Sequence, residues 1–287
     1  MTKNIYGENI FITGVSSGIG RASAEAFLKA GCKVTGVSRH VRETFKKYAN
    51  GAELTTRKMD VTDEAAVRRV IGSLAGVDVA VLSAGYGIAG SIEDVPLEQA
   101  RKQMEVNYLG VLSCVRALLP KMRRQGKGLI VIVGSVAGRI SIPMQSHYSA
   151  SKYALEALAE SLRLETEAFG IRTVILEPGD TRTGFTDHRE TLIPEDSVYR
   201  DAARQAIGRM EEDERHGTKA KKVAGAILRL CGKKEPPVRL AVGARYKVAV
   251  RLFPVFSDRS KEKCIRKIYM KQSGDSARSI KKRGSKG

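Results

Sequence analysis

The chain has 287 residues, of which 42% are hydrophobic and 28% are charged, and its formal net charge is +19. This composition is globular and long enough for one large core or two modest ones. No apolar run approaches the roughly 18 to 20 residues of a membrane-spanning helix, and no charged-then-apolar leader opens the sequence. The four cysteines have neither metal-ligand nor redox spacing, so we expect free thiols in a cytoplasmic protein.

The positive charge gathers towards the C-terminus. Residues 239–287 hold 15 Lys and Arg against three acidic residues. Nucleic acid is a common partner of basic surfaces, but aromatic residues make up only 6% of the chain and no recognition motif is present. A nucleic-acid partner is therefore disfavoured, although such a tail can give salt-sensitive, sequence-independent binding.

Strand-length apolar segments alternate with helix-length amphipathic segments from residue 8 to about 242. The expected strands are 9–14, 33–39, 53–60, 78–85, 128–135, 172–179 and 238–243. The expected helices are 19–30, 63–72, 97–125, 147–169, 195–212 and 219–232. Near-continuous runs of Val, Ile and Leu suit strands buried on both faces. The order predicts a doubly wound, Rossmann-like α/β fold with a seven-stranded parallel sheet, in one domain over residues 1–243.

The pattern changes after Gly243. Residues 244–271 mix apolar and basic side chains around Pro254, and residues 272–287 form a polar, basic tail that we expect to be disordered. A basic amphipathic segment can make peripheral contact with an anionic membrane surface. It can instead fold back over a pocket or form a subunit interface, and Pro254 and the interrupting acids slightly favour this second interpretation.

A glycine-rich turn follows the first expected strand and opens a helix. Glycines at such a position permit a tight turn, let backbone N–H groups approach a pyrophosphate and bring helix and strand close together. A structural turn without a ligand is the alternative for a glycine cluster taken alone. The turn predicts cofactor contacts from Gly14, Ser16, Ser17, Gly18, Ile19 and Gly20.

The residues after the second and third expected strands indicate which dinucleotide is bound. The second strand ends in Ser38-Arg39, where an acid would hold a ribose 2′-hydroxyl and an Arg accommodates a 2′-phosphate. NADP(H) is therefore favoured over NAD(H), with Ser16 as a further donor to that phosphate. A solvated residue after a strand is the alternative for Arg39. Asp60 and Val61 are expected to flank the adenine.

These features occur with others in a characteristic order. The chain resembles the short-chain dehydrogenase/reductase family over about residues 8 to 243, through TGVSSGIG at 13–20, Asp60, SAG at 83–85, Asn107, Ser135, YSASK at 148–152 and PG at 178–179 followed by Thr181. From Ala84 to Phe185 it is most similar to the steroid/retinoid dehydrogenase-like subgroup. The resemblance implies further cofactor contacts from Ser83, Ala84, Gly85, Tyr148, Lys152, Pro178, Gly179 and Thr181. The family usually has Asn-Asn-Ala-Gly at 82–85, so Ser83 is a departure that we expect to be tolerated, with an altered cofactor affinity.

Tyr148 and Lys152 lie four residues apart, so they share one face of the expected helix. A tyrosine has an ordinary pKa of about 10 and is a poor acid/base until positive charge from Lys152 and the nicotinamide lowers that pKa. Ser135 ends a strand and is expected to hydrogen-bond the substrate oxygen. The resemblance implies that Lys152 also binds the ribose and that Asn107 holds a proton-relay water, although a kinking or capping Asn is the alternative.

The loops after the strands indicate the kind of substrate. Residues 86–95, 138–146 and 180–200 follow strand ends, where loops shape a ligand pocket. Their apolar side chains suit a hydrophobic molecule, although core packing explains them about equally well. On the same helix as Tyr148, we expect Glu156, Glu160 and Glu165 to be solvated.

The predicted function is therefore an NADP(H)-dependent oxidoreductase that interconverts a ketone and a secondary alcohol on a hydrophobic, steroid- or retinoid-like substrate. The alternatives are a reductase of a fatty or small prochiral carbonyl and a non-catalytic NADP(H)-sensing scaffold. No metal site is expected, and the resemblance implies a homodimer or homotetramer.

Overall fold

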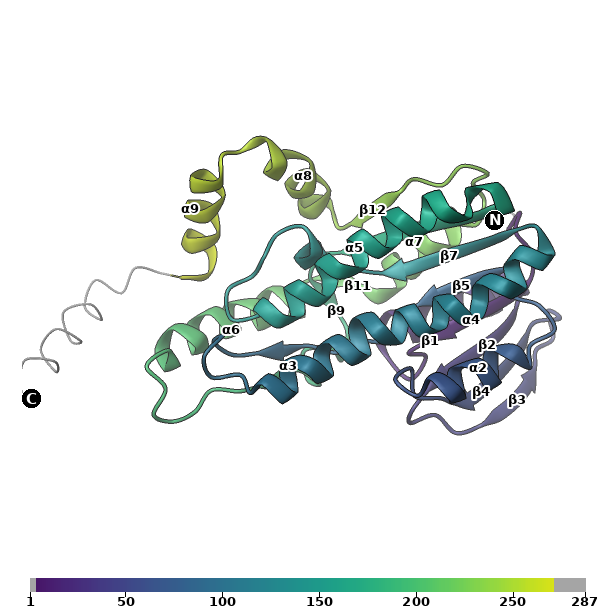
Figure 1. Cartoon of the computed structure of the whole chain (residues 1–287), viewed down its shortest axis with the longest axis horizontal. Coiled ribbons are helices and arrows are strands. Elements are labelled where there is room, and N and C mark those ends of the chain that lie inside the picture. The colour runs from purple at the N-terminus through teal and green to yellow at the C-terminus, as the bar shows by residue number, and fades with distance from the viewer. Residues whose placement is uncertain (1–3, 271–287) are drawn as a thin grey trace, which may run out of the picture.

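The computed structural model describes residues 4–270, with a mainly parallel β-sheet at its centre (Figure 1). The order across the sheet is β12 (Arg239–Val242), β8 (Ile171–Pro178), β7 (Gly128–Val133), β5 (Val79–Leu82), β1 (Asn9–Thr13), β2 (Lys33–Ser38), β4 (Glu53–Lys58) and β3 (Thr44–Lys47). The first seven are the predicted parallel strands. The sheet has eight strands rather than seven, because β3 pairs antiparallel with β4 at the edge. All four residues of β3 are exposed, so no burial pattern in its sequence predicts a strand.

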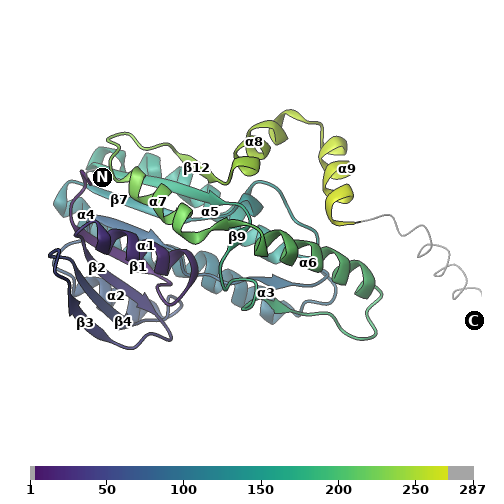
Figure 2. The same ribbon diagram turned by 180° about the vertical axis from the view of Figure 1, so that it is seen from behind.

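Helices cover both faces of the sheet and create two apolar cores. α1 (Gly18–Lys29) and α7 (Ala220–Leu230) pack on the face seen in Figure 2. The opposite face, seen in Figure 1, carries α2 (Glu64–Gly72), α4 (Gly110–Gln125) and α5 (Ser146–Thr166). Successive side chains of β1 point to opposite faces of the sheet, so Ile10 and Ile12 enter the first core and Phe11 enters the second. This is the doubly wound arrangement that the sequence predicts.

Two of the expected helices differ in detail. The segment 97–125 is divided into α3 (Leu97–Met104), a π-helical turn at Glu105–Leu109 and α4. Such π-helical turns within helices are frequent at functional sites, and this one carries Asn107. The expected helix at 195–212 begins later, as α6 (Arg200–Arg215).

Loops beyond the carboxyl ends of the strands are tied together by short strand pairs. β6 (Ile88–Ala89) pairs with β10 (Glu190–Thr191), and β9 (Thr181–Arg182) pairs with β11 (Thr218–Lys219). The Gly90 N–H donates to the Met144 carbonyl at 2.9 Å. These bonds bring together the three loops that the sequence assigns to a pocket. A third apolar cluster lies there, made by Ala89, Ala203, Ala206, Ile207 and Met210 with Ile142, Met144 and Ile193 packed against them.

The C-terminal segment forms α8 (Ala244–Leu252), a 3₁₀ turn at Phe253–Val255 and α9 (Asp258–Tyr269), which project from the main body (Figures 1 and 2). Tyr269 and Met270 fold back onto the third apolar cluster, and α9 contacts α6. The predicted disorder of 272–287 lies outside the described residues. Within residues 4–270, no helix combines the length and apolar character needed to cross a bilayer.

Candidate active site

Asn107 is fully buried in the π-helical turn and is held on three sides. Its Oδ1 accepts the Tyr86 N–H at 3.1 Å, and its Nδ2 donates to the Tyr86 carbonyl and to Ser151 Oγ, both at 3.0 Å. A Cβ added at Gly85 would lie 3.1 Å from Asn107 Oδ1 and 3.9 Å from Lys152 Nζ. The amide of Asn107 and the ammonium of Lys152 therefore approach the same glycine at the end of β5.

Tyr148 and Lys152 lie one turn apart on α5, as predicted from their spacing. Lys152 Nζ lies 5.6 Å from the centre of the Tyr148 ring and donates to the Val133 carbonyl at 3.0 Å. Ser135 follows β7, and its Oγ accepts the Ala137 N–H at 3.1 Å, which caps a short 3₁₀ turn. Because Val133 ends β7, these contacts place Tyr148, Lys152 and Ser135 at the carboxyl edge of the sheet beside Asn107.

Burial dominates the electrostatics of this pair. It raises the pKa of Tyr148 to about 12, although the neighbouring Ser135 hydroxyl lowers it; Glu214 raises it further and Arg189 lowers it. Burial also lowers the pKa of Lys152 to about 8. In the protein alone, desolvation therefore outweighs the nearby charges at Tyr148. The lowering of this pKa by Lys152 together with the nicotinamide stays a prediction.

The glycine turn has the shape that a dinucleotide pyrophosphate needs. Gly14 and Gly18 have φ of 74° and 56°, in the left-handed region that favours glycine. A Cβ at Gly20 would lie 2.3 Å from the Gly14 carbonyl oxygen, so α1 packs too closely on the turn for any side chain. Backbone donors at the start of α1 are thus open to a phosphate, while Ser16 and Ser17 are exposed in the turn and Ile19 packs against the core.

The residues predicted to choose the dinucleotide lie next to this turn. Ser38 Oγ donates to Ser16 Oγ at 3.1 Å, which joins the end of β2 to the glycine turn. Arg39 follows and is exposed. Asp60 Oδ1 accepts from the Thr62 N–H at 3.0 Å and from Thr62 Oγ1 at 2.8 Å, while Val61 is buried. The Asp60 carboxylate is therefore engaged in hydrogen bonds within its own turn.

The remaining predicted cofactor residues line the same edge. The N–H groups of Ser83 and Ala84 both donate to Thr13 Oγ1, which ties the end of β5 to the end of β1. Pro178 ends β8, and Thr181 Oγ1 donates to the Gly179 carbonyl at 2.7 Å. The structure thus brings the predicted catalytic and cofactor residues to one edge of the sheet.

Comparison with known proteins agrees with this arrangement. Residues 8–192 match the family model described as short chain dehydrogenase. The chain belongs to the short-chain dehydrogenase/reductase family. It is 36% identical to a 3-ketodihydrosphingosine reductase of Bacteroides thetaiotaomicron, over 82% of this chain and 87% of that protein. It is 32% identical to dehydrogenase/reductase SDR family member 7B of Mus musculus, over 80% of this chain and 72% of that protein.

A solved family structure gives the same fold. The short-chain dehydrogenase/reductase from Burkholderia phymatum, in complex with NAD, superposes with a TM-score of 0.74 at 26% identity and covers 87% of this chain and 94% of that one. The predicted family and Rossmann-like fold are confirmed. This short-chain dehydrogenase/reductase is an oxidoreductase that acts on CH–OH groups, and the glycine turn fits a nicotinamide dinucleotide.

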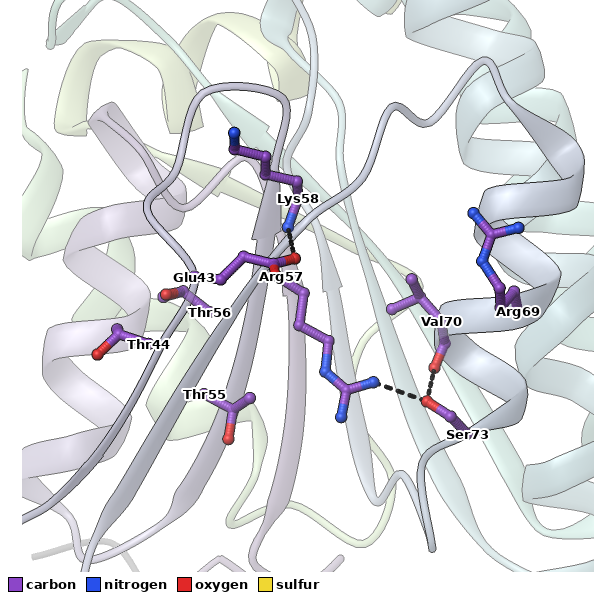
Figure 3. Close-up of a pocket in the computed structure, with 9 residues that line it drawn as sticks. All are labelled: Glu43, Thr44, Thr55, Thr56, Arg57, Lys58, Arg69, Val70 and Ser73. Carbon is purple, nitrogen blue, oxygen red and sulfur yellow. Dashed lines mark hydrogen bonds between the residues drawn. The ribbon is translucent and has the colours of Figure 1, made fainter.

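An open groove in this short-chain dehydrogenase/reductase lies elsewhere. It measures about 580 Å³ and lies beside the exposed edge of the sheet and α2 (Figure 3). Arg57 Nη1 donates to Ser73 Oγ at 2.8 Å across it, and the Lys58 N–H donates to the Glu43 carboxylate at 3.0 Å. None of the predicted site residues lines this groove, so we assign no function to it.

Sequence reasoning missed a buried ion cluster one turn beyond Lys152. Glu156 and Glu177 are 6% and 1% exposed, so the prediction of a solvated Glu156 is wrong, whereas Glu160 and Glu165 are exposed as expected. Arg239 Nε donates to Glu156 Oε2 at 2.8 Å, and Arg139 Nη1 donates to Glu177 Oε1 at 3.2 Å. Arg239 and Arg139 are far from Glu156 in sequence, so helical spacing alone gave no sign of the cluster.

This cluster predicts a pH-dependent stability. Burial and the Glu177 carboxylate raise the pKa of Glu156 from its ordinary 4.5 to about 7, although Arg239 and Arg139 oppose the shift. The folded state therefore favours protonated Glu156, and this preference stabilises the fold. The stabilisation is complete below pH 4.5 and is lost as the pH rises through 7. The unfolding free energy should therefore decrease between pH 4.5 and 7. In Glu156→Gln this decrease should be smaller by on the order of 2 kcal/mol, because Gln does not titrate.

Urea unfolding at several pH values, with m held in common, measures this difference. Glu165→Gln is the matched control, because Glu165 lies on the same helix but is exposed. An unchanged pH dependence in Glu156→Gln would show that Glu156 titrates normally in the fold.

Proposed function

We propose that this protein is an NADP(H)-dependent oxidoreductase that interconverts a ketone and a secondary alcohol on a hydrophobic substrate. The observation that carries the proposal is the approach of Asn107 and Lys152 to Gly85, with Tyr148 and Ser135 at the same sheet edge. Such an edge is where open α/β sheets bind ligands. The glycine turn beside it fits a dinucleotide.

The proposed roles follow from the chemistry of each group. During reduction, Tyr148 donates its phenolic proton to the substrate oxygen, to which Ser135 also hydrogen-bonds. Bound NADPH supplies the hydride. A raised pKa keeps the Tyr148 phenol protonated and ready to donate. Lys152 binds the ribose hydroxyls, and the second lone pair of Asn107 Oδ1 holds a relay water.

Apolar loops favour a hydrophobic substrate. Phe185 lies 5.6 Å from Tyr148 between ring centres, and the third apolar cluster occupies the loop side of the sheet. A steroid- or retinoid-like ketone is the first candidate. A fatty ketone is the second, and it is favoured by the 36% identity to a protein named 3-ketodihydrosphingosine reductase.

The test is oxidation of NADPH against a panel of steroid, retinoid, long-chain and small ketones. Turnover of a bulky or long-chain ketone would support the proposal, and the preferred framework would decide between the two candidates. NADPH binding without turnover of any ketone would contradict it and would favour the non-catalytic NADP(H)-sensing scaffold.

Arg39 is proposed to select NADP(H). Replacing Arg39 with Ala removes the guanidinium that would pair with the 2′-phosphate, so the ratio of kcat/KM for NADPH over NADH should fall about 10- to 100-fold. Lys33→Ala is the control, because Lys33 is an exposed cation at the other end of β2. A ratio that does not change in Arg39→Ala would remove Arg39 from the cofactor site.

Peripheral membrane contact is a further part of the proposal, and the C-terminal apolar patch supports it. This patch consists of Val248, Leu252, Val255 and Phe256, which are 57%, 52%, 81% and 53% exposed. Residues 244–270 around it hold eight Lys and Arg against two acids. Exposed apolar side chains within a basic surface are complementary to an anionic bilayer, from which a lipophilic substrate can enter.

Sedimentation with phosphatidylglycerol vesicles tests the membrane contact. Changing Val255 and Phe256 together to Ser should weaken vesicle binding by at least about tenfold, because two apolar side chains lose their burial in lipid. Phe45→Ser is the control, since Phe45 is 59% exposed on the distant strand β3. Equal binding to neutral vesicles, or no effect of the double change, would contradict the contact.

We also propose a cytoplasmic homodimer or homotetramer. The four cysteines are all unpaired, which suits a reducing compartment. Leu109, Tyr153 and Leu164 leave exposed apolar surface on the helices that carry Asn107 and Tyr148. Sedimentation velocity of the full chain tests the assembly, and a monomer at all concentrations would contradict it.

A further inference from the structure

Arg189 is a buried arginine that packs on Phe185, whose ring in turn packs on Tyr148, and nothing in the proposed mechanism uses it. The residue is 8% exposed, and its side chain is 1% exposed. Its guanidinium carbon lies 5.9 Å from the centre of the Phe185 ring, and that ring lies 5.6 Å from the Tyr148 ring. A Cβ at Gly87 would meet both Phe185 and Arg189, so the three residues pack at one place.

The position of Arg189 is fixed before any substrate binds. Its Nη2 pairs with one oxygen of the Glu214 carboxylate, and Thr186 Oγ1 donates to the other oxygen at 2.6 Å. The next residue, Glu190, donates its N–H to the Gly87 carbonyl at 3.0 Å and begins β10, which pairs with β6. Arg189 is therefore preorganised by α6 on one side and by the paired loops on the other.

Part of the guanidinium is left without an acceptor. Nε and Nη1 are both buried and have no hydrogen-bond partner among the described residues. These two nitrogens carry three of the five N–H donors of an arginine. Buried donors without acceptors are costly, so a purely structural Arg189–Glu214 pair explains the Nη2 contact but not the other donors.

We infer that Arg189 anchors the substrate by donating hydrogen bonds to a second oxygen on the hydrophobic ketone, several carbon atoms from the reacting carbonyl. Glu214 neutralises the charge of Arg189, so the site offers donors with little net charge. This favours a neutral hydroxyl or carbonyl oxygen over a carboxylate or phosphate. The inference rests on the proposed function and adds to it the chemical class of the substrate, an oxygenated lipophilic ketone.

The test compares substrates that differ in one oxygen. Straight-chain hydroxyketones, with the hydroxyl moved one carbon at a time, are assayed with NADPH against the plain ketone of equal length, and a steroid diketone is assayed against its monoketone. The wild-type protein should show a kcat/KM at least about tenfold higher for one oxygenated substrate of either framework. In Arg189→Lys, which keeps the charge and loses the planar fork, this ratio should fall towards one.

The outcomes separate the inference from the proposed function. Arg182→Lys, an exposed arginine on the same loop, should keep the wild-type ratio. Reduction of plain and oxygenated ketones at equal rates by the wild-type protein would overturn the inference and leave the proposed function standing, with no variant needed. The same ratio in wild type and Arg189→Lys would also overturn it. Reduction of no ketone at all would overturn both.

Discussion

Replacing Tyr148 with Phe is expected to lower kcat for ketone reduction by about 10²- to 10⁴-fold. The change removes one oxygen from a ring that is otherwise kept, so the contact with Phe185 remains. What is lost is the proton donor at the substrate oxygen, which must collect a proton as the hydride arrives on carbon. Steady-state oxidation of NADPH with the best ketone of the panel measures the effect.

The control separates chemistry from folding. Tyr153→Phe makes the same change on the same helix at a side chain that is 42% exposed, and it should leave kcat near the wild-type value. NADPH affinity of Tyr148→Phe should change by less than about tenfold, as expected for the loss of one hydrogen bond. A Tyr148→Phe protein with nearly full kcat would exclude Tyr148 as the proton donor.

Replacing Gly20 with Ala is expected to reduce NADPH affinity by at least about 100-fold and to destabilise the fold by about 1–3 kcal/mol. The new Cβ would lie 2.3 Å from the Gly14 carbonyl oxygen and 3.0 Å from the Thr13 carbonyl oxygen. Both contacts are with backbone, so α1 must move away from the turn that holds the pyrophosphate. Fluorescence titration with NADPH and urea unfolding measure the two effects.

Gly208→Ala is the matched control for Gly20. A Cβ there meets nothing within 4 Å, and Gly208 lies inside α6. Alanine is the better helix former, so this change should raise the unfolding free energy by about 0.5–1 kcal/mol and leave NADPH binding unaltered. Equal NADPH affinity in Gly20→Ala and wild type would show that the close packing of α1 on the turn does not shape the cofactor site.

Most of the fold is predictable because its strands are buried on both faces. The residues of β5 and β7 are buried throughout, and such runs are rare outside the centre of a covered parallel sheet. Strand β3 could not be predicted in this way, since exposed residues have no apolar period. The π-helical turn at Glu105–Leu109 was missed for a related reason: it inserts one residue without breaking the apolar pattern of the surrounding helix.

The candidate site likewise contains residues that the sequence can group and residues that it cannot. Tyr148 and Lys152 are close in sequence, and the glycine turn is contiguous, so motif spacing was enough to group them. Arg189 and Glu214 meet only through tertiary packing, and no local pattern marks either residue. Tyr246 on α8 also reaches the site only through tertiary packing. Its ring lies against Gly179 and leaves no room for a Cβ there. The burial of Glu156 could not be predicted either, because the charged residues around it come from distant parts of the sequence.

The most direct test of the central claim is a single turnover. Protein in excess over NADPH is mixed with the ketone that the panel favours, and the absorbance of NADPH and the amount of alcohol are followed together. The account predicts that one alcohol forms for each NADPH consumed in the wild-type protein, and that both changes are slowed in Tyr148→Phe. Tight NADPH binding with no loss of absorbance and no alcohol, for every ketone tried, would contradict it.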